Sequence, residues 1–502
     1  MRPLASAAPV PVAAAPVPAA APQAAAPRPD AGFSIVLAVT TILLLLVLGL
    51  ALVTLVAEDS ELSLNHVESN RAFYVAHAGI EYAAQKLAAD WSWRGLALPG
   101  KAVGAGAFWI APPDTLDEKG GALPEGHRRI VATGIVGRAK RVIEAQVAPG
   151  TISSVAGGGS RRGRDGDGSP AVSARLENPV GVAAAVNGDL YIADAGDHSI
   201  RRVEFPTGTI TTVAGTGVPG SRGDGGLAIE ARLNGPEDVF VAPNGDLYIA
   251  DTRNHAVRKV TAATGVISTV AGNRSPGAEG DGGPAVEARL SSPRAVAASE
   301  IGDLYIADTG NNKVRRVSAA TGNIGTVAGT GAPGYSGDGA RATAARLRAP
   351  EGVALGPNGD LYVADTGNHA VRRVALATGI MTGVAGTGAP GYSGDGAPAT
   401  SALLESPVAI DFGPSGDLYV ADTANHRIRR VRLSSGAIST IAGGVENGDL
   451  GDGGASTRAR LDGPRGIAVS PDGRYYIGGG SSGRVRRVTG ILSVVGWLEP
   501  PV

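Results

Sequence analysis

The segment G-D-L-Y-[IV]-A-D recurs at a constant spacing of 57 residues and ends at Asp194, Asp251, Asp308, Asp365 and Asp422. A weaker sixth copy, G-R-Y-Y-I-G-G, ends at Gly479. A fixed period of this size is typical of repeat architectures, in which one supersecondary unit is copied because it cannot bury its apolar faces alone. The number of repeats therefore constrains the fold more than any other feature of the chain.

Each repeat contains four short segments with the composition of β-strands. In the fourth copy these begin near Pro350, Gly359, His369 and Gly379, with P-N-G and A-T-G turns between them. Four strands per unit is the pattern of a propeller blade. In the second strand Leu361 and Val363 face one side while Tyr362 and Ala364 face the other, so both faces of the sheet must be covered by neighbouring blades.

The repeats predict a six-bladed ring. First-strand prolines occur six times, at Pro179, Pro236, Pro293, Pro350, Pro407 and Pro464. The fourth-strand pattern occurs seven times, first at 151–156 and last at 491–495. Because a closed ring leaves no exposed edge, we expect 151–156 to pair in blade six, with 491–495 beside it or displacing it.

Residues 151 to about 496 resemble NHL-repeat propellers, as D-L-Y-V-A-D-T-G-N-H-A-V-R-R-V from Asp360 shows. The resemblance implies a six-bladed all-β propeller over residues 151–502. It also implies a binding scaffold, the role of most members, or an enzyme, the role of a few.

The N-terminal part has a different composition. Residues 1–30 are rich in Ala and Pro and form no core, which predicts a disordered leader. Residues 31–57 form an apolar segment that carries no charge. This segment is long enough for one transmembrane helix. Arg2 and Arg28 precede this span while Glu58, Asp59 and Glu61 follow it, so the positive-inside tendency predicts an inner-membrane protein with its C-terminal bulk outside the cytoplasm.

Residues 58–150 predict an amphipathic stem helix and a small sheet. Phe73, Ala76, Ile80, Ala83 and Leu87 share one helical face. Period-2 stretches around Phe108, from His127 and from Arg138 predict a small antiparallel sheet packed on that helix.

The start G-F-S-I-V-L, the segment A-F-Y-V-A-H-A-G-I-E and the R-I-V-A-T-G…R-V-I-E-A sheet resemble PilX-type minor pilins over residues 31–148. This resemblance implies an α+β pilin-like anchor that a prepilin peptidase cuts between Gly32 and Phe33. It also implies pilin subunits as partners. The alternative is a plain envelope anchor that never enters a filament.

Two residue sets predict a polar face at one end of the ring, where the links between strands four and one and between strands two and three both emerge. The candidate ligand-binding residues are Asp167, Asp224, Asp281, Asp338, Asp395 and Asp452, in G-D-G turns, and His198, His255, His369 and His426. The functional interpretation is a platform for an unknown extracellular ligand. The alternative is that these aspartates only satisfy the turns they occupy.

The repeats also predict buried ion pairs within blades, such as Asp365 with Arg372 and Asp422 with Arg429, while Arg486 faces Gly479 and lacks that partner. No catalytic set, metal set or cofactor motif is recognisable, since the ring repeats the same side chains. A net charge of -1 argues against nucleic acid as a partner.

We therefore expect a membrane-anchored, pilin-like surface protein that displays a binding propeller, in type IV pilus-type assembly, adhesion or partner binding. The alternatives are a lactonase-like or lyase-like propeller enzyme and an envelope scaffold unrelated to pili.

Overall fold

The computed structural model describes residues 96–103, 106–111, 128–136, 139–444 and 446–498, together with Glu68, Arg71, Ala72, Val75 and Ala76. These five residues have helical backbone. The rest of the predicted stem helix, the leader and the apolar segment 31–57 lie outside the described residues. Within the described part of the chain, no helix is both long enough and apolar enough to cross a membrane.

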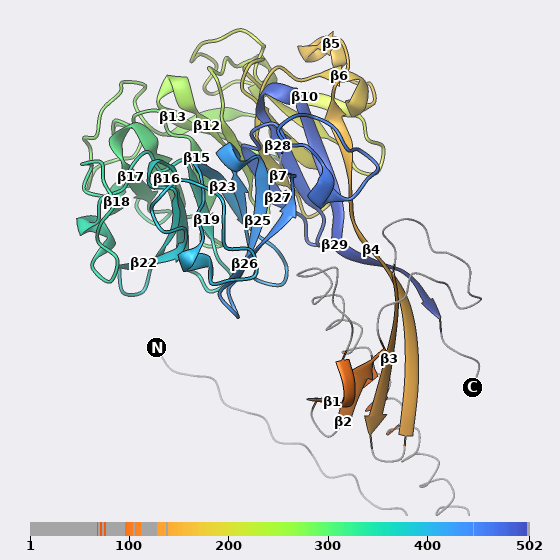
Figure 1. Ribbon diagram of the computed structural model, residues 1–502. Coiled ribbons are helices and arrows are strands. Elements are labelled where there is room, and N and C mark those ends of the chain that lie inside the picture. The colour runs from red at the N-terminus through yellow and green to blue at the C-terminus, as the bar shows by residue number, and fades with distance from the viewer. Residues whose placement is uncertain are drawn as a thin grey trace, which may run out of the picture. The chain divides into compact units, whose positions relative to one another are not determined.

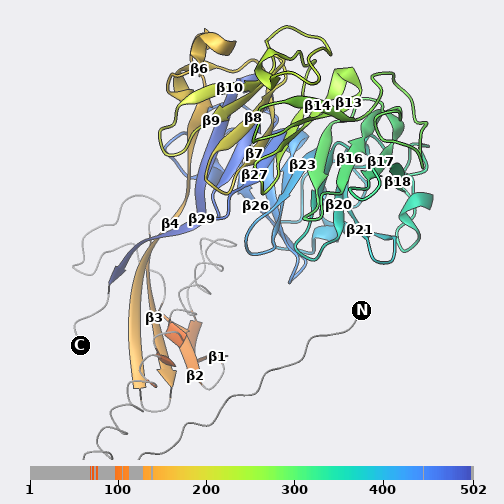
Figure 2. The ribbon, with the colours of Figure 1, turned by 180° about the vertical axis from the view of Figure 1, so that it is seen from behind.

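Six sheets follow one another around a ring (Figures 1 and 2). Five of them are four-stranded antiparallel meanders, and we number these blades one to five. Blade one is β7 (Pro179–Ala184), β8 (Leu190–Asp194), β9 (Ser199–Val203) and β10 (Ile210–Ala214); blade two is β11 (Asp238–Val241), β12 (Leu247–Asp251), β13 (Ala256–Val260) and β14 (Ile267–Ala271); blade three is β15 (Ala295–Ala298), β16 (Leu304–Asp308), β17 (Lys313–Val317) and β18 (Ile324–Ala328); blade four is β19 (Gly352–Leu355), β20 (Leu361–Asp365), β21 (Ala370–Ala375) and β22 (Ile380–Ala385); blade five is β23 (Pro407–Phe412), β24 (Leu418–Asp422), β25 (Arg427–Arg432) and β26 (Ala437–Ala442).

Blade six is part of a seven-stranded sheet with the order β1-β2-β3-β4-β29-β28-β27. Its strands are β27 (Gly466–Val469), β28 (Tyr475–Gly479), β29 (Arg484–Leu498) and β4 (Ala139–Gly157), and the sheet continues through β3 (Arg128–Val136), β2 (Gly106–Ile110) and β1 (Leu96–Val103). Short 3₁₀ turns lie between strands, at Gly163–Gly166, Ala171–Ser173, Ala228–Glu230, Thr252–Asn254, Thr309–Asn311, Ala342–Ala344, Thr366–Asn368, Ala399–Ser401, Thr423–Asn425, Ser456–Arg458 and Gly480–Ser482. A two-residue strand pair, β5 (Arg161–Arg162) with β6 (Ala174–Arg175), precedes blade one.

The N-terminal strand of the repeat region closes the ring, as predicted. Thr151 pairs with Thr489, and the register continues to Gly157 opposite Arg484, so 151–157 supplies the fourth strand of blade six. The expectation that 491–495 forms a second or displacing fourth strand is wrong. This segment extends β29 and pairs with the earlier part of β4, for example Val494 with Val147. The two strands leave blade six side by side in Figure 1.

The core consists of apolar clusters between neighbouring blades. Leu361 and Val363 pack toward blade three, while Tyr362 and Ala364 pack toward blade five, as the strand pattern predicted. One further cluster joins Ala156 and Tyr476 of blade six to blade one. Each fully buried Leu or Val contributes roughly 1.5 to 3 kcal/mol. The interfaces between blades therefore supply the main stabilisation of the ring.

The seam between blades six and one is closed by tight backbone packing. A Cβ atom at Gly466 or Gly478 would overlap the carbonyl oxygen of Val180. Only glycine permits this approach, which explains why blade six carries Gly478 where the second strands of the other blades carry alanine.

The small sheet β1–β4 is antiparallel and has one strand, β1, that the sequence pattern did not indicate. Its strand β3 contacts the helical residues at Gly134, where a Cβ atom would overlap the backbone of Ala72 and Ala76. The sequence did not predict that β4 belongs both to this sheet and to blade six.

Candidate functional site

The aspartates of the G-D-G turns bind buried arginines of their own blades. In blade four the Arg372 side chain is 0% exposed, and its Nη1 lies 3.3 Å from Asp365 Oδ2 while its Nη2 lies 2.8 Å from Asp338 Oδ1. Blade five repeats this with Arg429, at 3.2 Å from Asp422 and 2.9 Å from Asp395. The predicted pairs are thus present, and each extends to a second carboxylate that the sequence reasoning had assigned to a ligand-binding rim.

The other G-D-G aspartates have the same role. Asp167 pairs with Arg201, Asp224 with Arg258, Asp281 with Arg315 and Asp452 with Arg486, at 2.5 to 2.8 Å. Arg486, which lacks a second-strand aspartate, also lies 3.9 Å from Asp449. In blade four, burial raises the pKa of Asp365 to about 6 in spite of its hydrogen bonds and the nearby Arg372. The hydrogen bonds of these aspartates give them a structural role, and ligand binding by them stays a prediction.

The four histidines hold neighbouring blades together. Each occupies a left-handed backbone position, with φ between 50° and 54°, directly before a third strand. The Nδ1 atom of each histidine accepts a hydrogen bond of 3.0 to 3.1 Å from a backbone N–H group of the next blade. The pairs are His198 with Gly235, His255 with Ser292, His369 with Ser406 and His426 with Gly463. Asn312 does the same in blade three through its Oδ1. These bonds occupy one nitrogen in each of these four imidazoles.

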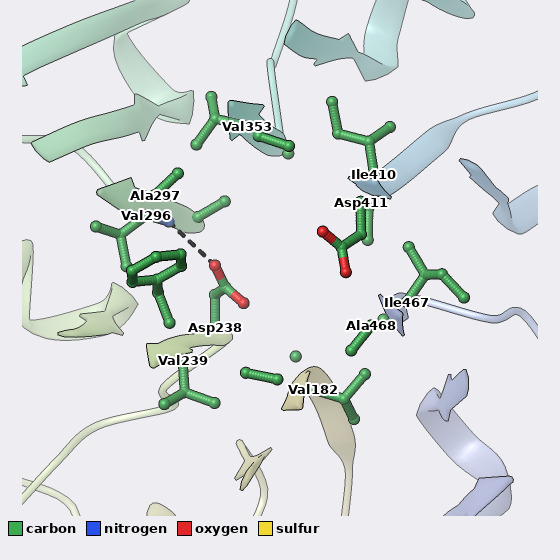
Figure 3. Close-up of a pocket in the computed structure, with 18 of the residues that line it drawn as sticks. Val182, Asp238, Val239, Val296, Ala297, Val353, Ile410, Asp411, Ile467 and Ala468 are labelled. Carbon is green, nitrogen blue, oxygen red and sulfur yellow. Dashed lines mark hydrogen bonds between the residues drawn. The ribbon is translucent and has the colours of Figure 1, made fainter. Parts of the chain in front are cut away.

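The first strands of all six blades line a central cavity of about 270 Å³. Its walls are mostly Val, Ile and Ala, but Asp238 of blade two and Asp411 of blade five point into it from opposite sides (Figure 3). Each carboxylate accepts a backbone N–H from the next blade, Val296 for Asp238 and Val469 for Asp411, at 3.0 and 2.7 Å. Burial raises the pKa of Asp238 to about 7 and that of Asp411 to about 6.

The central cavity is the channel of the propeller, and at one mouth of it ion pairs link four charged side chains. Arg294 Nη1 lies 2.6 Å from Glu351, and its Nε lies 3.4 Å from Glu237. Arg465 of blade six reaches the same two carboxylates, at 3.2 and 3.6 Å. These four side chains, which we name the mouth ring, are 14% to 30% exposed, so solvent still reaches them.

The sequence reasoning missed the mouth ring, although a signal was present. The residues that follow the six first-strand prolines are Val180, Glu237, Arg294, Glu351, Val408 and Arg465. Blades that share their buried arginines and turn aspartates therefore differ in charge at this position. A comparison of the repeats column by column would have found it.

Next to the mouth ring lies a depression of about 390 Å³ at the seam between blades six and one. Asn178, Asp462 and Ser481 add hydrogen-bonding groups to its wall, and Glu237, Arg294 and Arg465 also border it. The arrangement can hold a small polar molecule through both acidic and basic groups. Among the described residues, no group of three or more His, Cys, Asp or Glu side chains is placed to hold a metal ion.

Family models match the ring. The NHL repeat model matches residues 176–202, 233–260 and 404–431, and the Teneurin NHL domain model matches residues 284–375. The repeat region is therefore an NHL-type β-propeller. These matches fall within the repeats, and the PilX-type likeness of residues 31–148 stays a prediction.

Similar proteins share the repeat region. The chain is 30% identical to SUPPRESSOR OF QUENCHING 1 of Arabidopsis thaliana, covering 53% of this chain and 26% of that protein. It is 30% identical to Teneurin-3 of Mus musculus, covering 68% of this chain and 13% of that protein. It thus spans about a quarter or less of the length of these two relatives.

Among solved structures, an auxiliary nutrient binding protein from Bacteroides ovatus has a TM-score of 0.50 at 17% identity, covering 79% of this chain and 98% of that one. A protein of unknown function from Bacteroides thetaiotaomicron also has a TM-score of 0.50, at 19% identity, covering 73% of this chain and 82% of that one. Both likenesses concern the fold alone.

The two neighbouring arginines of β21 test the role of the buried network. Arg372→Ala leaves Asp365 buried without its cation, so we expect a loss of about 3 to 5 kcal/mol in the free energy of unfolding. Arg373→Ala removes an ion pair to Asp360 from a side chain that is 41% exposed, and we expect a loss of about 1 kcal/mol or less. Urea unfolding of both variants measures the difference, and equal losses would contradict the structural role of Arg372.

Proposed function

We propose that the propeller is a binding module that holds a small polar ligand at the mouth ring. The observation that carries this proposal is the broken symmetry at the channel mouth. The six blades repeat their buried arginines and turn aspartates, but they carry different charges where the first strands enter the channel. A scaffold alone needs no such difference, since valine fills the same position in blades one and five.

The chemistry of the mouth defines the kind of ligand. The two carboxylates and the two guanidinium groups of the mouth ring neutralise each other's charge. A ligand can bind there by replacing one of these ion pairs with its own charge-assisted hydrogen bonds. The adjacent Asp462, Ser481 and Asn178 suit hydroxyl groups. We therefore favour a polar ligand with hydroxyl, carboxylate or amino groups. The nutrient-binding description of the Bacteroides ovatus neighbour is compatible with this class of ligand.

We propose that residues 31–57 anchor the chain in the inner membrane and that the propeller lies outside the cytoplasm, in a pilus-type or other envelope assembly. The support is the uncharged apolar segment and the pilin-like residues that follow it. Pilin subunits or envelope proteins are the corresponding partners.

A ligand screen by thermal shift, using sugars, amino acids and organic acids, tests the binding site. We expect a hit to bind the wild type and Arg474→Gln alike, because Arg474 lies in the turn between β27 and β28 and pairs with Asp472. Arg465→Gln removes a charged partner at the mouth ring and should weaken binding about 10-fold or more. Equal affinity in all three proteins would refute the site, and consumption of the ligand would identify an enzyme.

The mature N-terminus tests the display proposal. Mass spectrometry of the protein purified from its native membrane should find a chain that begins at Phe33, because the pilin-like motif places cleavage after Gly32. Gly32→Leu is expected to block the cut and retain the leader. A wild-type chain that begins at Met1 would exclude prepilin-type processing.

A further inference from the structure

Blades two to five share an asparagine that fills a position between two oxygen atoms. In blade two the Asn254 Nδ2 amide donates to Asp251 Oδ2 and to the carbonyl oxygen of Gly220, both at 2.7 Å. The same two bonds recur at 2.6 to 2.9 Å for Asn311, Asn368 and Asn425. One amide thus supplies both hydrogens that these oxygens need.

Blade one has an acid at this position. Asp197 stands where the other blades have asparagine, and an ionised carboxylate has no hydrogen to donate. Asp194, the counterpart of Asp251, is 0% exposed. Its Oδ1 accepts the backbone N–H groups of Glu177 and Asn178, while its Oδ2 has no hydrogen-bond partner. A buried carboxylate oxygen without a partner costs considerable free energy, which indicates a missing positive group.

Two further residues define the surroundings of this oxygen. Gly163 occupies the position of Gly220, and a Cβ atom on it would lie 2.8 Å from Asp197 Oδ2, so the loop rests against the Asp197 carboxylate. Arg201 makes no hydrogen bond to Asp194 Oδ2. Its Nη2 pairs with Asp167 at 2.8 Å, but its Nη1 has no partner, whereas the equivalent Nη1 atoms of blades two to five lie 3.2 to 3.4 Å from their aspartates.

We propose that blade one binds one calcium ion between Asp194, Asp197 and the Gly163 carbonyl group. The available donors are oxygens alone, which is the ligand type that calcium takes, and the partly exposed Asp197 leaves room for water to complete the coordination. The ion replaces the asparagine amide as the link between the turn after β8 and the loop at Gly163. Asp194 accepts the N–H of Asn178, which borders the depression beside the mouth ring, but the site uses none of the four mouth-ring side chains, so its test does not depend on the proposed function.

The carboxyl groups of Asp194 and Asp197 both have raised pKa values. Burial is the main cause that raises the pKa of Asp194, to about 6, and the neighbouring Asp197 raises it further. Arg201 acts in the opposite direction, and burial also raises the pKa of Asp197, which faces Glu177, His198 and Arg201.

The experiment uses two reciprocal substitutions in the full chain after treatment with a chelator. Asp197→Asn gives blade one the amide that blades two to five use, so it should fold as the wild type does. Asn368→Asp places the same acid pair in blade four. Isothermal titration with calcium chloride at pH 7.5 measures the number of sites, and thermal unfolding with and without calcium measures their effect.

We expect one calcium ion per wild-type chain, none for Asp197→Asn and a second ion for Asn368→Asp. A hundredfold excess of calcium over its Kd should raise the wild-type Tm by about 5 °C and leave that of Asp197→Asn unchanged. Calcium binding that survives in Asp197→Asn would overturn the proposal. So would a wild-type Tm that ignores calcium but falls as the pH rises from 5 to 7, since a shared proton would then fill the place of the ion.

Discussion

The pairing of β4 with β29 is the interaction on which the ring depends. Every blade is apolar on both faces, so each sheet is stable only between two neighbours. A ring built from consecutive repeats would end in an open sheet edge at blade six. The strand 151–157 covers that edge and places Ile152 and Ala156 in the cores on the two sides of blade six. Closure thus joins the two ends of a chain segment of more than 300 residues.

Inside this ring, conspicuous residues serve the fold. A buried arginine in each blade needs carboxylates, which the G-D-G turns and most second strands provide. The histidines link neighbouring blades through Nδ1. Repetition is therefore a sign of structure in this molecule. The two binding sites that we propose lie where the repeats disagree, at the mouth ring and at Asp197 of blade one.

The sequence predicted the blades well because a strand with two apolar faces and a fixed period has few alternatives. The period and the prolines predicted six blades, and the surplus fourth-strand pattern predicted closure by 151–156. The predicted position of 491–495 was wrong. This segment has the composition of a fourth strand, but it follows the third strand of blade six directly and therefore extends β29. The stem helix and the apolar span lie mostly outside the described residues and stay predictions.

The candidate site was harder to predict because its residues act across the ring. Arg465 and Glu351 are 114 residues apart, and their contact follows from the circular arrangement of the blades. Asp238 and Asp411 likewise occupy different positions within their repeats, and only the ring brings both side chains to the same channel, from opposite sides (Figure 3). A motif search along the chain cannot find such sets, whereas a comparison of the repeats at equivalent positions can.

Disulfide cross-linking tests the closure most directly, since the chain contains no cysteine. Thr151 and Thr489 are directly opposed, with their hydroxyl oxygens 2.8 Å apart. The variant with Thr151→Cys and Thr489→Cys should form an intramolecular disulfide under mild oxidation and migrate differently on a non-reducing gel. The control with Thr151→Cys and Thr326→Cys, in blades six and three, should stay reduced. Cross-linking of the first pair no faster than the control would contradict a ring closed by its N-terminal strand.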